Sequence, residues 1–317
     1  MLSLPEPGTP FHRLARTEAH RWWRPVVGTL ILAVAWFGSL PALAVAVDAV
    51  SLIVHEPTGV NGALRFSPTS AAWLSVLTVG LLLPAALLAA RDVQNRPVGT
   101  LASVTGRVRL GWLGGCLLVA AVTTVGWIAG GELVYEAMGD GDNGTPVGAG
   151  KFGRNVLIFL APTVLMAVAL EYAFRGWLLQ AVGGFSKKLW TAIAVQAVLY
   201  AAAFGTDGPW SFADWLVTGA VLGWLAVRTG GLEAGIALMT CLYLTGLGYD
   251  ALYGWLTYFG PYDDLDWQIF ALNLVVNLVY AAVVTRLARR RGIVTVSAEP
   301  AAGSYTVGSN VVEPEPV

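Results

Sequence analysis

The chain has 317 residues, of which 56% are hydrophobic and only 12% are charged, and its formal net charge is −1. Soluble domains carry about 25% charged residues, so this composition excludes an ordinary soluble domain and is typical of a multi-span membrane protein. The balanced charge gives no support to nucleic-acid binding. Both cysteines, Cys116 and Cys241, lie in apolar runs, where we expect them to pack as small hydrophobes rather than form a disulfide or a metal site.

The N-terminal arm, residues 1–25, ends in the basic stretch FHRLARTEAHRWWRP. Trp22 and Trp23 are typical of an aromatic anchor at a membrane interface. The apolar run that follows is far longer than the core of a cleavable signal peptide. We therefore expect this run to remain in the protein as a membrane span.

Eight apolar runs are long enough, or nearly long enough, to cross a bilayer as helices, which takes about 20 residues each. The predicted fold class is an all-α polytopic membrane protein with about eight transmembrane helices, and counts of seven or nine stay open. The fifth run is short for a full span and could be tilted or partly buried by protein. The runs cover residues 26–50, 71–90, 111–133, 156–181, 189–204, 212–229, 232–253 and 266–286.

The loops between these runs differ in charge from one side to the other. Lys and Arg favour the cytoplasmic side of membrane proteins, and the pattern places both termini there. Most of the 19 basic residues then fall inside: Arg13, Arg16, Arg21, Arg24, Arg91, Arg96, Arg107, Arg109, Lys187, Lys188, Arg228, Arg286, Arg289, Arg290 and Arg291. The outside loops collect acids instead: Glu132, Glu136, Asp140, Asp142, Asp207, Asp250, Asp263, Asp264 and Asp266.

These patterns predict three parts of the chain. A cytoplasmic arm (1–25) precedes a transmembrane helical domain (26–291), and a cytoplasmic tail (292–317), rich in small residues, Pro and Glu, is expected to be disordered. Within the domain, residues 91–110 mix basic and apolar side chains. This favours an inside loop over an interfacial helix, since Pro97 and Gly99 would delay a helix.

Two charged residues stand inside the fourth run, in the stretch LEYAFRGWLLQ. Glu171 and Arg175 are four residues apart and share a helix face. A charge at the bilayer centre costs at least about 2.5–3.5 kcal/mol, so such residues usually face the protein interior and carry function. A structural ion pair that locks the bundle is the alternative.

The sequence around this pair resembles the CPBP family, which contains CAAX prenyl endopeptidases and bacteriocin-processing (Abi-type) intramembrane proteases. The family's first motif has two adjacent glutamates, with an arginine four residues after the first, usually as Phe-Arg-Gly. Glu171 matches the first glutamate and Arg175 the arginine, whereas Tyr172 replaces the second glutamate.

The other two family motifs are recognisable by position, but their histidines are absent. An aromatic residue followed four later by histidine corresponds here to Tyr200 and Phe204. A histidine followed four later by Asn or Asp, after an RTGGL turn, corresponds to Met239 and Tyr243; a shift by one residue would bring in Thr240. The resemblance covers residues 155–250 and implies a catalytic signature that is degenerate.

The family's chemistry, as the resemblance implies, is peptide-bond hydrolysis in the membrane, with a glutamate activating water and histidines stabilising the oxyanion or binding a metal. Here the only histidines are His12, His20 and His55, all outside the predicted spans. Losing one oxyanion donor can cost roughly 10²–10³ in rate. Zinc wants three protein ligands, and only Glu171 is available. We expect no cofactor and no metal.

Other polar side chains occur in the same runs. Interhelical hydrogen bonds are the simpler role for them, and the alternative is that they line a cavity around Glu171. They are Gln196, Tyr200, Thr240, Tyr243, Asn273 and Asn277.

Three functions are compatible with these features. The favoured one is a pseudoprotease that binds hydrophobic peptides or membrane proteins without cutting them, for scaffolding, chaperoning or immunity to a peptide toxin. The second is a divergent but active intramembrane endopeptidase that uses Glu171 and Arg175. The third is a small-solute transporter or channel subunit, against which the sequence shows no inverted repeat. We expect the chain in the plasma (inner) membrane of a bacterium.

Overall fold

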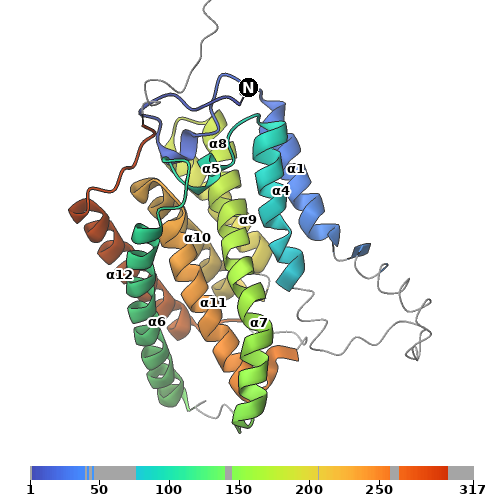
Figure 1. The fold of residues 1–317 in the computed structure, drawn as a ribbon. Helices are drawn as coiled ribbons and strands as arrows, with labels where there is room; N and C mark the ends of the chain where they lie inside the picture. The colour runs from blue at the N-terminus through green and yellow to red at the C-terminus, as the bar shows by residue number, and fades with distance from the viewer. Residues whose placement is uncertain are drawn as a thin grey trace, which may run out of the picture.

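A computed structural model of the chain describes residues 2–39, 41–42, 45, 76–139, 145–205, 207–257 and 264–298. Within these ranges the chain forms helices joined by loops, and β-structure is limited to isolated bridges, which confirms the predicted all-α class. The bundle is shown in Figure 1. Its elements are η1 (Phe11–Arg13), α1 (Trp23–Phe37), α4 (Leu82–Leu88), η2 (Ala89–Val93), α5 (Gly99–Ala102), α6 (Leu110–Met138), α7 (Ala149–Leu170), η3 (Glu171–Leu178), α8 (Leu179–Phe185), α9 (Leu189–Phe204), α10 (Pro209–Thr229), α11 (Glu233–Tyr253), η4 (Trp255–Thr257) and α12 (Trp267–Arg290).

Six helical stretches among the described residues are long and apolar enough to cross a membrane: Val76–Val93, Leu110–Met138, Ala149–Phe185, Pro209–Thr229, Glu233–Tyr253 and Trp267–Arg290. Two further apolar helices, α1 and α9, are shorter. Each predicted run therefore coincides with an apolar helix, although the second half of the first run lies largely outside the described residues. The exact number of membrane crossings stays a prediction.

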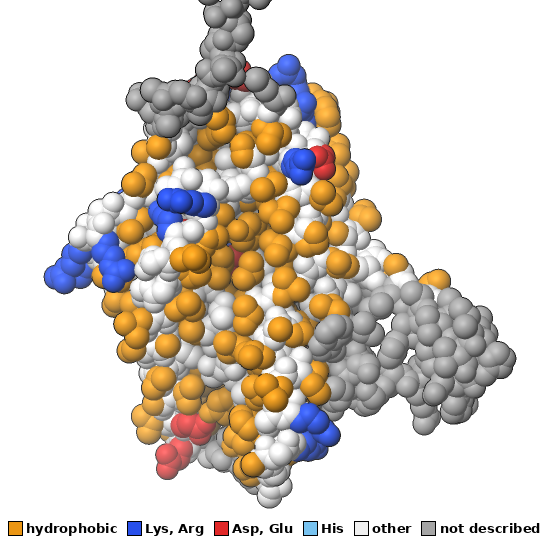
Figure 2. Space-filling view, viewed as in Figure 1, with side chains coloured by type: hydrophobic (Ala, Val, Ile, Leu, Met, Phe, Trp, Pro, Cys, Tyr) orange, Lys and Arg blue, Asp and Glu red, His pale blue; other side chains and the backbone are white. Residues whose placement is uncertain are grey.

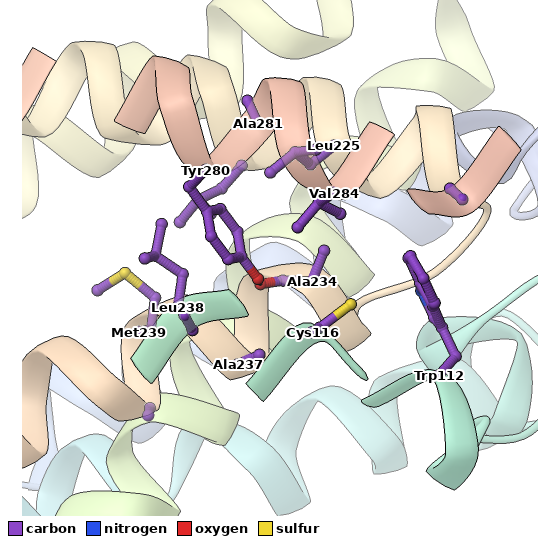
Figure 3. Packing of buried hydrophobic residues seen from close by; sticks show 14 residues of the cluster. Trp112, Cys116, Leu225, Ala234, Ala237, Leu238, Met239, Tyr280, Ala281 and Val284 are labelled. Carbon is purple, nitrogen blue, oxygen red and sulfur yellow. The ribbon is translucent and has the colours of Figure 1, made fainter. Parts of the chain in front are cut away.

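Helix α11 occupies the interior of the bundle, where it packs against α6, α7 and α10. The core around the start of α11 is mainly apolar. The Tyr280 hydroxyl of α12 donates a 2.7 Å hydrogen bond to the Ala234 carbonyl of α11. Figure 3 shows Tyr280 lying among Ala234, Leu238 and Met239. Because a buried phenol needs a hydrogen-bond partner, this contact fixes α12 against the start of α11.

The segments predicted to be cytoplasmic gather at one end of the bundle, which we call the basic end. The arm meets the chain after α12 through a bridge between Pro10 and Val296. Arg16 donates to the Gly184 carbonyl at the end of α8, and Ser103 bridges Gly231 between α10 and α11. Figure 2 shows apolar side chains over the middle of one face, with most of the visible Lys and Arg towards this end. Its cytoplasmic location stays a prediction.

Residues 94–109 form a loop at the basic end that contains only the four-residue helix α5, as favoured over an interfacial helix. The loop is held by Arg96, whose guanidinium is fully buried. It donates to side-chain oxygens of Gln94 (2.6 Å), Thr100 (2.6 Å) and Gln180 of α8 (2.7 Å). Burial lowers the pKa of Arg96 to about 9, so the group is still charged at neutral pH; neutral acceptors bind its Nε and Nη1, whereas Nη2 is buried without a partner among the described residues.

Candidate functional site

The centre of the candidate site is the ion pair between Glu171 and Arg175. Nη1 of Arg175 lies 3.0 Å from Oε1 of Glu171, and both side chains are fully buried. Removing one partner of such a pair strongly destabilises the folded protein, because the other charge stays buried and uncompensated. The structure thus keeps the two charges together in the interior of the bundle.

The pair lies on an irregular piece of helix. Residues Glu171–Leu178 of η3 have π-helical geometry, between the regular helices α7 and α8. Single π-turns inside α-helices are rare and frequently occur at functional sites. Gly176 of this segment lets η3 approach the α5 loop, since a Cβ there would stand 3.1 Å from the Leu101 carbonyl oxygen.

Helix α11 touches the carboxylate of Glu171 at Gly235. A Cβ on Gly235 would lie 2.0 Å from Oε2 of Glu171 and 2.6 Å from its Cδ. Only glycine therefore fits between α11 and this carboxylate. The carboxylate is covered on one side by Arg175 and on another by the backbone of α11.

The hairpin RTGGLEAG delivers Gly235 to this contact. Gly230 ends α10 with φ +68°, a left-handed conformation that favours glycine. Glu233 begins α11 and is almost fully buried, and its two carboxylate oxygens accept bonds of 2.8 Å and 2.7 Å from Nε and Nη2 of Arg109. This bidentate ion pair connects the start of α11 to the start of α6.

Aromatic side chains occupy the other side of the ion pair. The Arg175 guanidinium stands 4.1 Å from the centre of the Tyr200 ring, a favourable cation–π distance. Phe204, at the position of the family's first histidine, contacts the rings of Tyr200 (5.1 Å), Trp215 (5.4 Å) and Trp36 (5.3 Å). Phe204 thus fills the site with a hydrophobic contact and offers no hydrogen-bond donor.

The remaining substituted positions are also packed. Met239, at the second histidine position, is 1% exposed and lies in the core of α6, α10, α11 and α12. Tyr243, one turn on, is partly buried and faces Tyr200. Tyr172 is partly buried and packs against buried hydrophobic side chains. Thr240 has a buried hydroxyl without a hydrogen-bond partner among the described residues.

Three amides of the predicted set are divided between two places. Gln196 lies in the interface of α9 and α10, where its Nε2 donates 2.7 Å to the Gly219 carbonyl. Asn273 and Asn277 of α12 instead line a cavity between α6, α10, α11 and α12, together with Met239 and Tyr243.

The histidines do not enter this site among the described residues. His12 and His20 belong to the arm at the basic end, where His12 packs near Gly183 and His20 near Gly184 of α8; His55 lies outside the described residues. No three His, Cys, Asp or Glu side chains converge in the described parts of the chain. The residues around Glu171 do not fit the ligand set of a catalytic metal.

Fold and site together define an integral membrane protein of all-α class with a sealed carboxylate–guanidinium pair in its interior. The segment that carries this pair, residues 152–245, matches the family model described as type II CAAX prenyl endopeptidase Rce1-like. The match confirms the resemblance to the CAAX-protease family and spans all three motif regions. Searches of curated proteins and of solved structures gave no match.

Sequence reasoning missed three residues that shape the site. Gly235 and Glu233 lie in the RTGGLEAG hairpin. Their contacts, with Glu171 and with Arg109, can be recognised only once the position of α11 relative to η3 and α6 is known. Asp214 is a partly buried carboxylate in α10 that lines the same cavity as Asn273. Asp214 could have been found from the sequence, because it is an acidic residue near the start of the predicted span 212–229.

Proposed function

We propose that the chain is a CAAX-protease-like membrane protein that binds hydrophobic peptides or membrane segments of other proteins without cleaving them. The observation that supports this most directly is an apolar groove of about 280 Å³ on the outer side of η3. The residues that line it are Thr29, Leu32, Ala33, Trp36, Phe37, Leu82, Ala173, Phe174, Trp177, Leu178, Leu199, Ala202 and Ala203.

The groove is apolar and partly open. Thr29 contributes the one hydroxyl of its lining, and this hydroxyl is already engaged, accepting from Nε1 of Trp177 (3.1 Å) and donating to the Pro25 carbonyl (2.8 Å). Phe37 and Leu199 stand at the edge with large exposed surfaces. An apolar side chain or helix ridge therefore fits the groove, whereas a polar ligand would find no partner there.

The residues that hydrolysis would use, Glu171 and Arg175, do not line this groove. Phe174 and Trp177 belong to its lining, whereas Glu171 and Arg175 of the same segment are fully buried and are not part of it. A general base has to reach the proton it abstracts, directly or through one water. Phe204 and Met239 add no donor for an oxyanion, so the geometry favours binding over cleavage.

The test is binding and cleavage of a defined probe by the full chain in liposomes. The probe is a synthetic leucine- and alanine-rich transmembrane peptide carrying a fluorophore, followed by energy transfer and by mass spectrometry. We expect saturable binding of intact peptide, weakened by Ala203→Trp, which fills the groove. The control Leu118→Trp places the same bulk on the exposed face of α6 and should change nothing.

Two results would count against this function. Equal binding by wild type and the Ala203→Trp variant would remove the groove from the proposal. Cleavage of the peptide by wild type, lost on Glu171→Gln, would favour the divergent endopeptidase that uses Glu171 and Arg175.

A further inference from the structure

A second cavity, which has Tyr243 in its lining, differs in character from the groove. It lies between α6, α10, α11 and α12, which stand side by side in Figure 1, and it measures about 170 Å³. At about 30 Å³ per water, it has room for roughly five or six water-sized groups. None of its lining elements is α1, α4 or α9, so it is independent of the proposed peptide groove.

One polar group of this cavity, the side-chain amide of Asn273, is oriented by a hydrogen bond. Nε1 of Trp127, which can only donate, gives a 2.6 Å bond to Oδ1 of Asn273. Because its Oδ1 accepts this bond, the NH₂ group of Asn273 remains a donor, and Asn273 and Asp214 line the same cavity.

Asn277 is oriented in the same way. Its Nδ2 donates to Oγ1 of Thr218 (3.2 Å) and to the Asn273 carbonyl (3.0 Å). Its Oδ1 is consequently left as an acceptor, and this atom is buried without a hydrogen-bond partner among the described residues, in a side chain that is only 5% exposed. A buried acceptor left unpaired costs about 1–3 kcal/mol, and this atom has almost no accessible surface towards the cavity, so it does not itself bind a ligand.

The cavity therefore offers negative charge and acceptors, but no positive charge among its lining residues. The ion pairs among the described residues are Arg91–Asp92, Arg109–Glu233 and Arg175–Glu171, and Asp214 belongs to none of them. The rest of the wall is mainly apolar or aromatic, including Trp127, Trp215 and Met239. Hard metal cations want about six oxygen ligands, whereas an ammonium needs a few acceptors and gains from aromatic faces.

We propose that this cavity binds a small primary alkylammonium ion. Its NH₃⁺ group would donate to the carboxylate of Asp214, and its short alkyl chain would lie against Trp215, Leu238 and Met239. The site lies within reach of the family-motif position Tyr243, which lines the same cavity.

The experiment is isothermal titration calorimetry of butylammonium chloride into the full chain in nanodiscs of zwitterionic lipid. Butan-1-ol, with the same number of heavy atoms, is the neutral comparison in wild type and needs no variant. We expect saturable binding of the ammonium and at least tenfold weaker binding of the alcohol, because a charge-assisted hydrogen bond in a buried site is worth that much or more.

Variants then assign the site. Asp214→Asn keeps the shape and should weaken butylammonium binding at least about tenfold. Asp207→Asn removes an exposed carboxylate just before the same helix and should have no effect. The proposal is overturned if wild type does not bind butylammonium, if Asp214→Asn binds it like wild type, or if Na⁺ alone occupies the cavity and butylammonium does not displace it.

Discussion

Replacing Gly235 by alanine is the sharpest test of how α11 holds the carboxylate of Glu171. The new Cβ would stand 2.0 Å from Oε2 of Glu171, whereas ordinary contact begins at 3.4 Å, so the side chain or helix α11 has to move by about 1.4 Å. Overpacking of this kind costs about 1–3 kcal/mol. The cost rises further if the movement parts Glu171 from Arg175.

A second glycine of the same helix provides a matched control. Gly248 also lies inside α11, and a Cβ there would meet nothing within 4 Å. Alanine raises helix propensity by about 0.8–1 kcal/mol at either position, so this gain cancels between the two variants. The difference in free energy of unfolding between Gly235→Ala and Gly248→Ala should therefore report the clash alone, about 1–3 kcal/mol.

The assay is reversible unfolding in mixed micelles, followed by circular dichroism. A third substitution, Glu171→Asp, tests the clash directly. It shortens the side chain by one C–C bond, ~1.5 Å. The difference in stability between the two alanine variants should therefore shrink when both also carry Glu171→Asp. Equal stability of the two alanine variants in the wild-type background, or an unchanged difference when both also carry Glu171→Asp, would refute the geometry.

Three further predictions follow from the same structure. Glu171→Ala and Arg175→Met should each lower the free energy of unfolding by about 3–5 kcal/mol, whereas the double variant Glu171→Leu/Arg175→Met should regain most of it; additive losses in micelle unfolding would contradict this. Burial, and secondarily the charge of Arg13, lowers the pKa of His12, so the folded arm holds a neutral imidazole and its docking weakens as pH falls below 6.5. The protection factors of the arm's amides, which correct for the intrinsic pH dependence of exchange, should accordingly fall between pH 7.5 and 5.5 in wild type and fall less in His12→Leu, and equal falls would be evidence against it. Gln180→Leu removes an acceptor of Arg96 and the donor to the Thr100 carbonyl and should cost about 1–3 kcal/mol in thermal unfolding, whereas Gln180→Glu loses the same donor but supplies a carboxylate to Arg96 and should cost less; the reverse order would be inconsistent with a charged Arg96.

Much of the bundle was predictable because membrane helices are encoded locally. A run of apolar residues such as 111–133 is long enough by itself to predict a span, and α6 contains all of it. The bounds were less predictable. Helix α6 continues to Met138 through Glu132 and Glu136, because helix ends beyond the hydrocarbon are set by caps such as Gly139 at φ +82° and not by apolarity.

The surroundings of Glu171 were less accessible from sequence because they depend on contacts between distant segments. The resemblance located Glu171, Arg175 and the substituted positions, and spacing placed the first two on one helix face. The contact of Gly235 with the Glu171 carboxylate depends on how α11 packs against η3. The contact of Phe204 with Trp36 depends on how α9 packs against α1. The polar cavity shows the same limit, since Trp127, Asp214 and Asn273 come from three helices and line one cavity only when these helices meet.

The substitutions and the ion pair are best understood together. A family histidine at position 204 would have to place a polar ring among the aromatic rings of Trp36, Tyr200 and Trp215. Phenylalanine removes that desolvation cost, and the aromatic wall that results covers the guanidinium of Arg175 through Tyr200. Glu171 and Arg175 then have to neutralise each other, since removing either would leave a buried charge. The pair is therefore expected from stability alone in a chain without histidine at positions 204 and 239, and the presence of Glu171 is by itself no argument for catalysis.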